Sequence, residues 1–205
     1  MNLKHWIAVM GLAAAGTAIA GGAPKSRDIL FLFDGSIGAQ VFRSAGGTPT
    51  LNTVAGVNPG GIPWGMTSFR AIVRNTGEIH ARGTGVLLLG GDNIGTRGGP
   101  RQVILSLFCR NAPVPPAVAG SLQTTPFNSA PIDLDEDGDF QLRGTLADGT
   151  GAAPPLSCGD DVDNRPVLLV RSVTPANPST GAPAAPGAWF AAGVIAPNAK
   201  KGLGR

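Results

Sequence analysis

The sequence is poor in the residues that carry most enzyme chemistry. Its 205 residues include no tyrosine, two histidines and two cysteines, and aromatic residues make up 5%. No G-x-S-x-G motif occurs, and a Ser-His-Asp triad would have to use His80, beside which nothing in the sequence places a serine. A zinc site built from His and Cys needs cysteines that are free. Nucleophilic catalysis and zinc chemistry are therefore not indicated, and the sequence favours a protein that is not an enzyme.

Long apolar runs and a strong net charge are absent as well. Beyond the N-terminus no stretch of about 18 strongly apolar residues occurs, which excludes a polytopic membrane protein. The 31 glycines follow no three-residue period, which excludes collagen. A formal net charge of +3 is too small to indicate a nucleic-acid partner. With 42% apolar and 14% charged residues, the chain is expected to fold rather than to be disordered.

The N-terminal segment has the pattern of a secretory signal peptide. A short basic start precedes the uncharged residues 6–20, which end in the small-x-small pattern Ala18-Ile19-Ala20. We expect cleavage after Ala20 and export to the periplasm or the extracellular space, with an uncleaved anchor as the alternative. After cleavage no integral membrane segment is expected. Residues 21–197 are then expected to form one domain, followed by a basic tail at 198–205.

Two cysteines remain in the part that is expected to be exported. Exported proteins usually oxidise such pairs, so we predict a disulfide between Cys109 and Cys158. The bridge would close a loop of about 50 residues, which is worth roughly 4 kcal/mol in the loop-entropy description. Free thiols or a nucleophilic cysteine are the alternative.

Short apolar runs bounded by Gly, Pro, Asn and Asp dominate the rest of the chain, and no apolar stripe of helical period appears. Eight runs are expected to be strands: residues 29–33, 68–74, 78–89, 102–110, 132–134, 140–146, 167–173 and 188–195. This spacing predicts an all-β fold, namely an antiparallel β-sandwich with a barrel as the alternative. Long loops rich in Gly or Pro are expected at residues 90–100, 111–131 and 174–187, the last of them flexible.

The clearest predicted hairpin joins residues 68–74 to the strand that starts at Glu78. A three-residue turn, Asn75-Thr76-Gly77, lets Gly77 take a positive φ. The resulting register sets Arg74 opposite Glu78, Ile72 opposite His80 and Arg70 opposite Arg82.

Four outward side chains of this hairpin form a candidate anion-binding face: Arg70, Arg74, His80 and Arg82. Directly opposed arginines are unfavourable unless an anion lies nearby. That anion could be a ligand or the acidic segment of the same chain. A structural or solvated face is the alternative.

An acidic stretch matches D-x-D-x-D-G, the first half of a calcium loop. Its carboxylates are those of Asp133, Asp135, Asp137 and Asp139. An EF-hand is excluded, because position 12 of the loop is a glycine instead of a glutamate and no flanking helices are expected.

Further carboxylates follow the second cysteine, at Asp160, Asp161 and Asp163. So many negative charges on a short segment repel one another, and a cation would relieve the repulsion. Asp and Gly are also ordinary turn residues for backbone reasons alone. Two interpretations therefore stay open, a calcium-binding β-turn and a plain acidic hairpin turn.

Trp64, Trp189 and Phe190 are the notable aromatic residues of the expected domain. Exposed on one surface, they would form a platform for carbohydrate. Because so few aromatic residues are available to build a core, we predict that they are buried.

Four short motifs combine with the N-terminal signal: GGIPW at 60–64, LDEDGDF at 134–140, PVLLVR at 166–171 and WFAAG at 189–193. In these the chain resembles small exported bacterial β-domain proteins of unassigned function. The resemblance implies a compact secreted β-domain and brings no catalytic residue with it.

Taken together, these features predict an exported, non-enzymatic extracytoplasmic β-module with a binding or envelope-structural role. The alternatives are a calcium-stabilised surface or matrix module and a secreted hydrolase. Calcium is the one candidate cofactor, and the sequence identifies no partner.

Overall fold

The structure is a computed structural model that describes residues 29–111, 121–159, 165–181 and 183–196. The predicted signal peptide, Asp160, Asp161, Asp163 and the tail at 198–205 lie outside these residues. Within them the chain forms strands and no helix: β1 (Ile29–Gly38), β2 (Phe42–Ala45), β3 (Thr48–Leu51), β4 (Trp64–Gly65), β5 (Ser68–Arg74), β6 (Glu78–Thr84), β7 (Leu87–Leu88), β8 (Gln102–Phe108), β9 (Phe127–Asn128), β10 (Ile132–Asp133), β11 (Phe140–Thr145), β12 (Val167–Thr174) and β13 (Ala185–Ile195).

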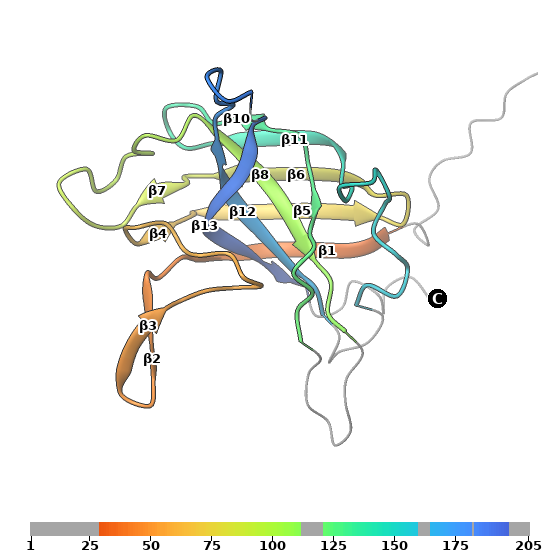
Figure 1. Cartoon of the computed structure of the whole chain (residues 1–205), viewed down its shortest axis with the longest axis horizontal. Helices are drawn as coiled ribbons and strands as arrows, with labels where there is room; N and C mark the ends of the chain where they lie inside the picture. Colours follow the sequence, from red (N-terminus) through yellow and green to blue (C-terminus); the bar gives the residue numbers. More distant parts are fainter. Residues whose placement is uncertain (1–28, 112–120, 160–164, 182, 197–205) are drawn as a thin grey trace, which may run out of the picture.

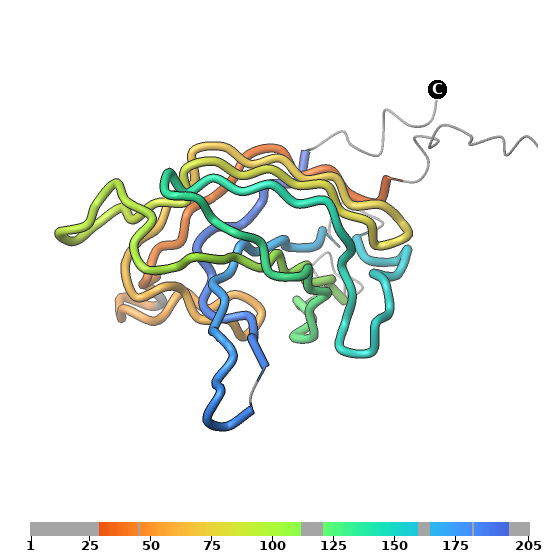
Figure 2. The backbone as a smooth tube through the Cα atoms, turned by 90° about the horizontal axis from the view of Figure 1, so that it is seen from above, coloured from red at the N-terminus to blue at the C-terminus, as the bar shows by residue number. Residues whose placement is uncertain are grey.

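One antiparallel sheet makes up most of the molecule, in the order β10-β8-β12-β13-β1-β5-β6-β11, with β9 on β8. Figure 1 shows β8, β12 and β13 running across β1, β5, β6 and β11, and Figure 2 shows these groups as two layers. The end strands β10 and β11 follow each other along the chain and contact each other, so the sheet nearly closes on itself. The predicted all-β fold is confirmed, as a barrel-like sheet whose halves pack like a sandwich.

The core lies between the two layers. Phe33, Val73 and Ile79 reach it from one layer, and Leu105 and Leu168 reach it from the other, all fully buried. Strands β5 and β6 alternate between buried and exposed side chains, as strands with one solvated face do. By contrast, Val103–Phe108 and the middle of β12 are buried on both faces. The unbroken apolar run at 167–170 is typical of a strand that is covered on both faces.

The predicted aromatic core is also confirmed. Trp64, Trp189 and Phe190 are each about 95% or more buried. The rings of Trp64 and Phe190 stack with centroids 4.0 Å apart. None of the three aromatic side chains is therefore exposed as a platform for carbohydrate.

Several predicted boundaries were wrong. The expected strand at 78–89 breaks after β6, because Gly85 has φ +64 and leaves the ladder, and β7 pairs with β4 in a separate sheet. The Pro-rich segment 111–131 contains β9, and the loop expected at 174–187 is shorter because Ala185 and Pro186 pair with β12. The sequence prediction also missed the hairpin of β2 and β3 and the two-residue strand β4.

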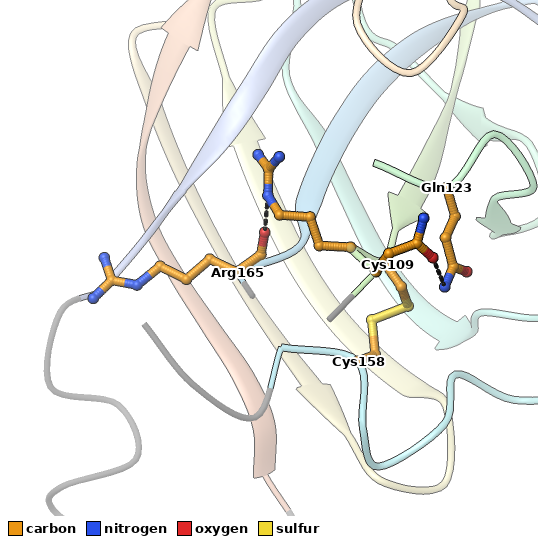
Figure 3. The surroundings of a disulfide bond; sticks show 6 residues. Cys109, Gln123, Cys158 and Arg165 are labelled. Carbon is orange, nitrogen blue, oxygen red and sulfur yellow. Dashed lines mark hydrogen bonds between the residues drawn. A yellow bond between two sulfur atoms is a disulfide. The ribbon is translucent and has the colours of Figure 1, made fainter. Parts of the chain in front are cut away.

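The predicted disulfide is present. Cys109, just after β8, is bonded to Cys158 with a Cα–Cα distance of 5.1 Å, and both side chains are about 99% buried (Figure 3). The bridge joins the end of β8 to the turn that follows β11. No helix long and apolar enough to cross a membrane occurs among the residues that the structure describes.

Candidate functional site

The hairpin of β5 and β6 has the predicted register. Arg70 is paired with Arg82, and Ile72 with His80. Gly77 takes φ +82 in the three-residue turn, and its N–H donates to the carbonyl of Arg74 over 3.0 Å. The turn therefore fixes which side chains point outward.

These outward side chains form what we call the arginine face, made of Arg70, Arg74, His80, Arg82 and Arg143. The fifth member comes from β11, whose Arg143 is paired with His80 and whose Gln141 is paired with Arg82. Strands β5, β6 and β11 lie side by side in Figure 1. The side chains of Arg70, Arg82 and Arg143 are exposed, whereas their neighbours along each strand are buried or half-buried.

One carboxylate serves two members of this face. Glu78 lies 3.2 Å from the Nε of Arg74 and 2.7 Å from the Nε2 of His80. Asp34 on β1 is the cross-strand neighbour of Arg70, but their charged groups are not within ion-pair distance. Among the described residues no ion pair is formed by Arg70, Arg82 or Arg143. In the middle of the face, three guanidinium groups therefore have no paired carboxylate from the described ranges.

The four predicted calcium ligands lie in and beside a tight turn between β10 and β11. One carboxylate oxygen of Asp135 accepts the backbone N–H groups of Asp137 (3.0 Å) and Asp139 (2.8 Å). An oxygen of Asp139 accepts the N–H of Gly85 over 2.8 Å, and one of Asp133 accepts the Gln102 amide over 2.9 Å. Three of the four carboxylates therefore hold the turn and its neighbours in place.

The acidic turn and the arginine face meet in one shallow pocket of about 440 Å³. Its lining includes Asp133, Asp135 and Asp139 from the acidic turn, and Arg82 and Gln141 from β6 and β11. Asp137 is not part of the lining. No group of three or more His, Cys, Asp or Glu side chains placed to hold a metal ion occurs in the described ranges.

His80 has a carboxylate partner and no nucleophile in the described structure. Its ring nitrogen contacts Glu78, and its neighbours across the strands are Ile72 and Arg143. Both cysteines are used in the disulfide. No Ser-His or Cys-His arrangement for nucleophilic catalysis is therefore formed by these residues.

Two groups away from the arginine face have shifted pKa values. The hydroxyl of Thr150 and the N–H groups of Ala152 and Thr150 donate to Asp148, and they lower the pKa of its carboxyl below the usual value. Burial lowers the pKa of the Arg171 guanidinium. Arg171 donates to the carbonyls of Pro186 and Gly187, at the start of β13. The Asp148 carboxylate thus accepts hydrogen bonds from the backbone N–H groups of a turn. The Arg171 guanidinium donates hydrogen bonds to backbone carbonyls of β13.

Sequence reasoning missed Arg143 as a member of the site. The predicted strand at 140–146 contains it, and the alternation of that strand puts it outward. Its place beside His80 depends on the pairing of β11 with β6, which brings together two residues 63 positions apart (143 − 80) and has no local signal.

No protein-family model, no curated protein and no solved structure matches this chain.

Proposed function

We propose that this protein is an exported, non-enzymatic binding module that holds an anionic group on its arginine face. The observation that carries the proposal is the pairing of Arg70 with Arg82, with Arg143 on the next strand and no carboxylate at ion-pair distance from any of them among the described residues. Like charges directly opposite each other in a sheet are destabilising. An anion bound between the guanidinium groups removes this destabilisation.

The chemistry of arginine favours this use. Each guanidinium is permanently charged and offers five N–H donors in a planar fork that fits carboxylate, sulfate and phosphate oxygens. Because the side chains stand on paired strands, the rigid sheet fixes their spacing. The sheet therefore fixes the backbone positions from which the guanidinium groups reach a ligand.

A carboxylate lies at each end of β6 and so marks the limits of the arginine face. Glu78 is the first residue of β6. The Asp139 carboxylate accepts a hydrogen bond from the N–H of Gly85, the residue that follows the end of β6. The positive region is thus confined to the middle of the strands. This arrangement favours a discrete sulfate, phosphate or carboxylate group carried on a larger ligand, such as an anionic polysaccharide. The disulfide supports a role outside the cytoplasm, where such bridges persist.

The test uses calorimetry with dextran sulfate as the probe, on the oxidised full chain at several salt concentrations. We expect binding that weakens as salt rises and that falls at least tenfold in the double variant Arg70→Gln/Arg82→Gln. The matched control is Arg165→Gln, a guanidinium near the disulfide that points away from it (Figure 3). The control should bind as the parent does.

Thermal unfolding without ligand separates a binding role from a structural one. Removing two opposed charges should leave the double variant at least as stable as the parent. If the double variant instead melts well below the parent, the two arginines stabilise the folded state and their role is structural. Unchanged binding by the double variant, or an equal loss in Arg165→Gln, refutes the arginine face as the site.

A further inference from the structure

His80 lies among the guanidinium groups of the arginine face. Its side chain is 42% exposed on the outer side of β6, so both solvent and a bound ligand can reach it. Arg143 is its cross-strand neighbour on β11. Arg82 lies two residues further along β6 on the same face, about 7 Å along the strand, and Arg70 is paired with Arg82. An anion held between these arginines is therefore a neighbour of the imidazole ring.

Glu78 determines which nitrogen of His80 takes up a proton. One carboxylate oxygen of Glu78 lies 2.7 Å from the Nε2 of His80, and an ionised carboxylate can only accept hydrogen bonds. The Nε2 atom therefore carries a hydrogen in the neutral ring as well as in the charged ring. Protonation occurs on Nδ1, where it adds one N–H donor and one positive charge and leaves the contact with Glu78 in place.

The charged groups around His80 have opposite effects on its protonation. These groups are Arg70 and Arg74 on β5, Glu78 and Arg82 on β6, and Arg143 on β11. The carboxylate favours the imidazolium form, whereas the guanidinium groups disfavour it. With the carboxylate counted, four arginines and one glutamate give the arginine face a charge of +3 when His80 is neutral and +4 when it is protonated.

We propose that protonation of His80 strengthens anion binding on the arginine face, an inference that rests on the function proposed above. Without a ligand, the arginines repel the added charge. A bound anion supplies the opposite charge, so binding draws a proton from solvent onto Nδ1. Because such coupling is reciprocal, a lower pH tightens binding. The charge of histidine ordinarily changes between about pH 5 and 8, so the arginine face holds its ligand more tightly in mildly acidic surroundings.

The experiment is calorimetry with dextran sulfate on the oxidised full chain, in the same salt at about pH 5.5 and at about pH 7.5. The sulfate groups of this probe stay ionised over that range, so a change in affinity reports on the protein. We expect binding to be about fivefold tighter at the lower pH, which is the low end of coupling between sites in proteins. Titrations between these pH values, in two buffers of different ionisation enthalpy, should show proton uptake by the parent itself.

Two histidine variants assign the proton to its residue. His80→Gln keeps an N–H donor for Glu78 and has no group that takes up a proton in this range. The variant should bind as the parent does at the higher pH, and it should show neither the tightening at the lower pH nor the proton uptake. His5→Gln is the matched control, because His5 is the other histidine of the chain, and it should keep both effects.

Affinity at the two pH values distinguishes the role of His80 from the binding site itself. A parent that binds equally at both pH values, with no proton uptake, overturns the inference and leaves the arginine face as the binding site. A parent that binds at neither pH refutes the arginine face and the inference with it. Tightening that persists in His80→Gln, or that disappears in His5→Gln, would show that the proton is taken up elsewhere and would overturn the inference as well.

Discussion

Gly138 combines a positive φ with a close approach to the backbone of another segment. Its φ is +78, and an added Cβ would lie 2.6 Å from the carbonyl oxygen of Val86 and 2.8 Å from its nitrogen. The close approach exists because the acidic turn packs on the backbone after β6, where the N–H of Val86 donates to the carbonyl of Gly138 over 2.9 Å. One missing side chain therefore lets the turn reach the end of the hairpin.

Replacing Gly138 by alanine should destabilise the fold by about 2 kcal/mol or more, because both the backbone conformation and the contact with Val86 become strained. Urea unfolding of the purified variant gives the difference in the free energy of unfolding. Gly149→Ala is the control, since an added Cβ there meets nothing within 4 Å and its φ is not positive. If both variants unfold at the parent's midpoint, the turn is not packed against Val86 as described.

Single residues also show how far the site could be predicted from sequence. The opposition of Arg70 and Arg82 follows from the turn, because Gly77 at a three-residue hairpin leaves one register that keeps polar and apolar faces apart. The approach of Asp135 and Asp139 to Arg82 could not be predicted. It depends on the pairing of β11 with β6 and on Gly85, and neither leaves a local pattern.

At the scale of elements, strands with a clear apolar alternation were predictable and strands without one were not. Strand β5 matches its predicted bounds because Phe69, Ala71 and Val73 alternate with polar or half-buried residues. Strands β2 and β3 contain mostly small and polar residues, so their apolar pattern is weak, although Gly46-Gly47 is a strong turn signal. The two-residue strands β4, β7 and β9 are too short to show any period.

The turn between β10 and β11 leads to a prediction at this scale. We expect the melting temperature of the oxidised chain to be the same in EDTA and in millimolar Ca²⁺. Asp135 and Asp139 each use an oxygen to hold backbone N–H groups, as ordinary turn residues do. Bound calcium at 100 times its Kd would add about 2.7 kcal/mol, which is a rise of several degrees.

Magnesium is the control for a general ionic effect. A rise with Ca²⁺ but not with Mg²⁺, lost in Asp135→Asn and Asp137→Asn, would contradict the plain turn. It would establish the calcium-stabilised module as the better description of this protein.

At the scale of the whole molecule, the strands that bring the sheet close to closure differ in how many residue pairs they form with their neighbours. The segment between the two cysteines contains β9, β10 and β11. Strand β11 makes six residue pairs with β6, whereas β9 and β10 each make two with β8. The bridge between Cys109 and Cys158 holds this segment at both of its ends, so it fixes the strands that bring the sheet close to closure.

Removing the bridge should therefore destabilise the whole fold. The cysteines are 49 positions apart, and opening a loop of that length costs about 4 kcal/mol in the loop-entropy description, or roughly 10 °C in melting temperature. Calorimetry of Cys109→Ala/Cys158→Ala beside the oxidised parent measures the shift. A reducing agent should lower the parent's midpoint by a similar amount and leave the variant unchanged. Equal midpoints for the oxidised parent and the variant would mean that the short pairings of β9 and β10 close the sheet unaided.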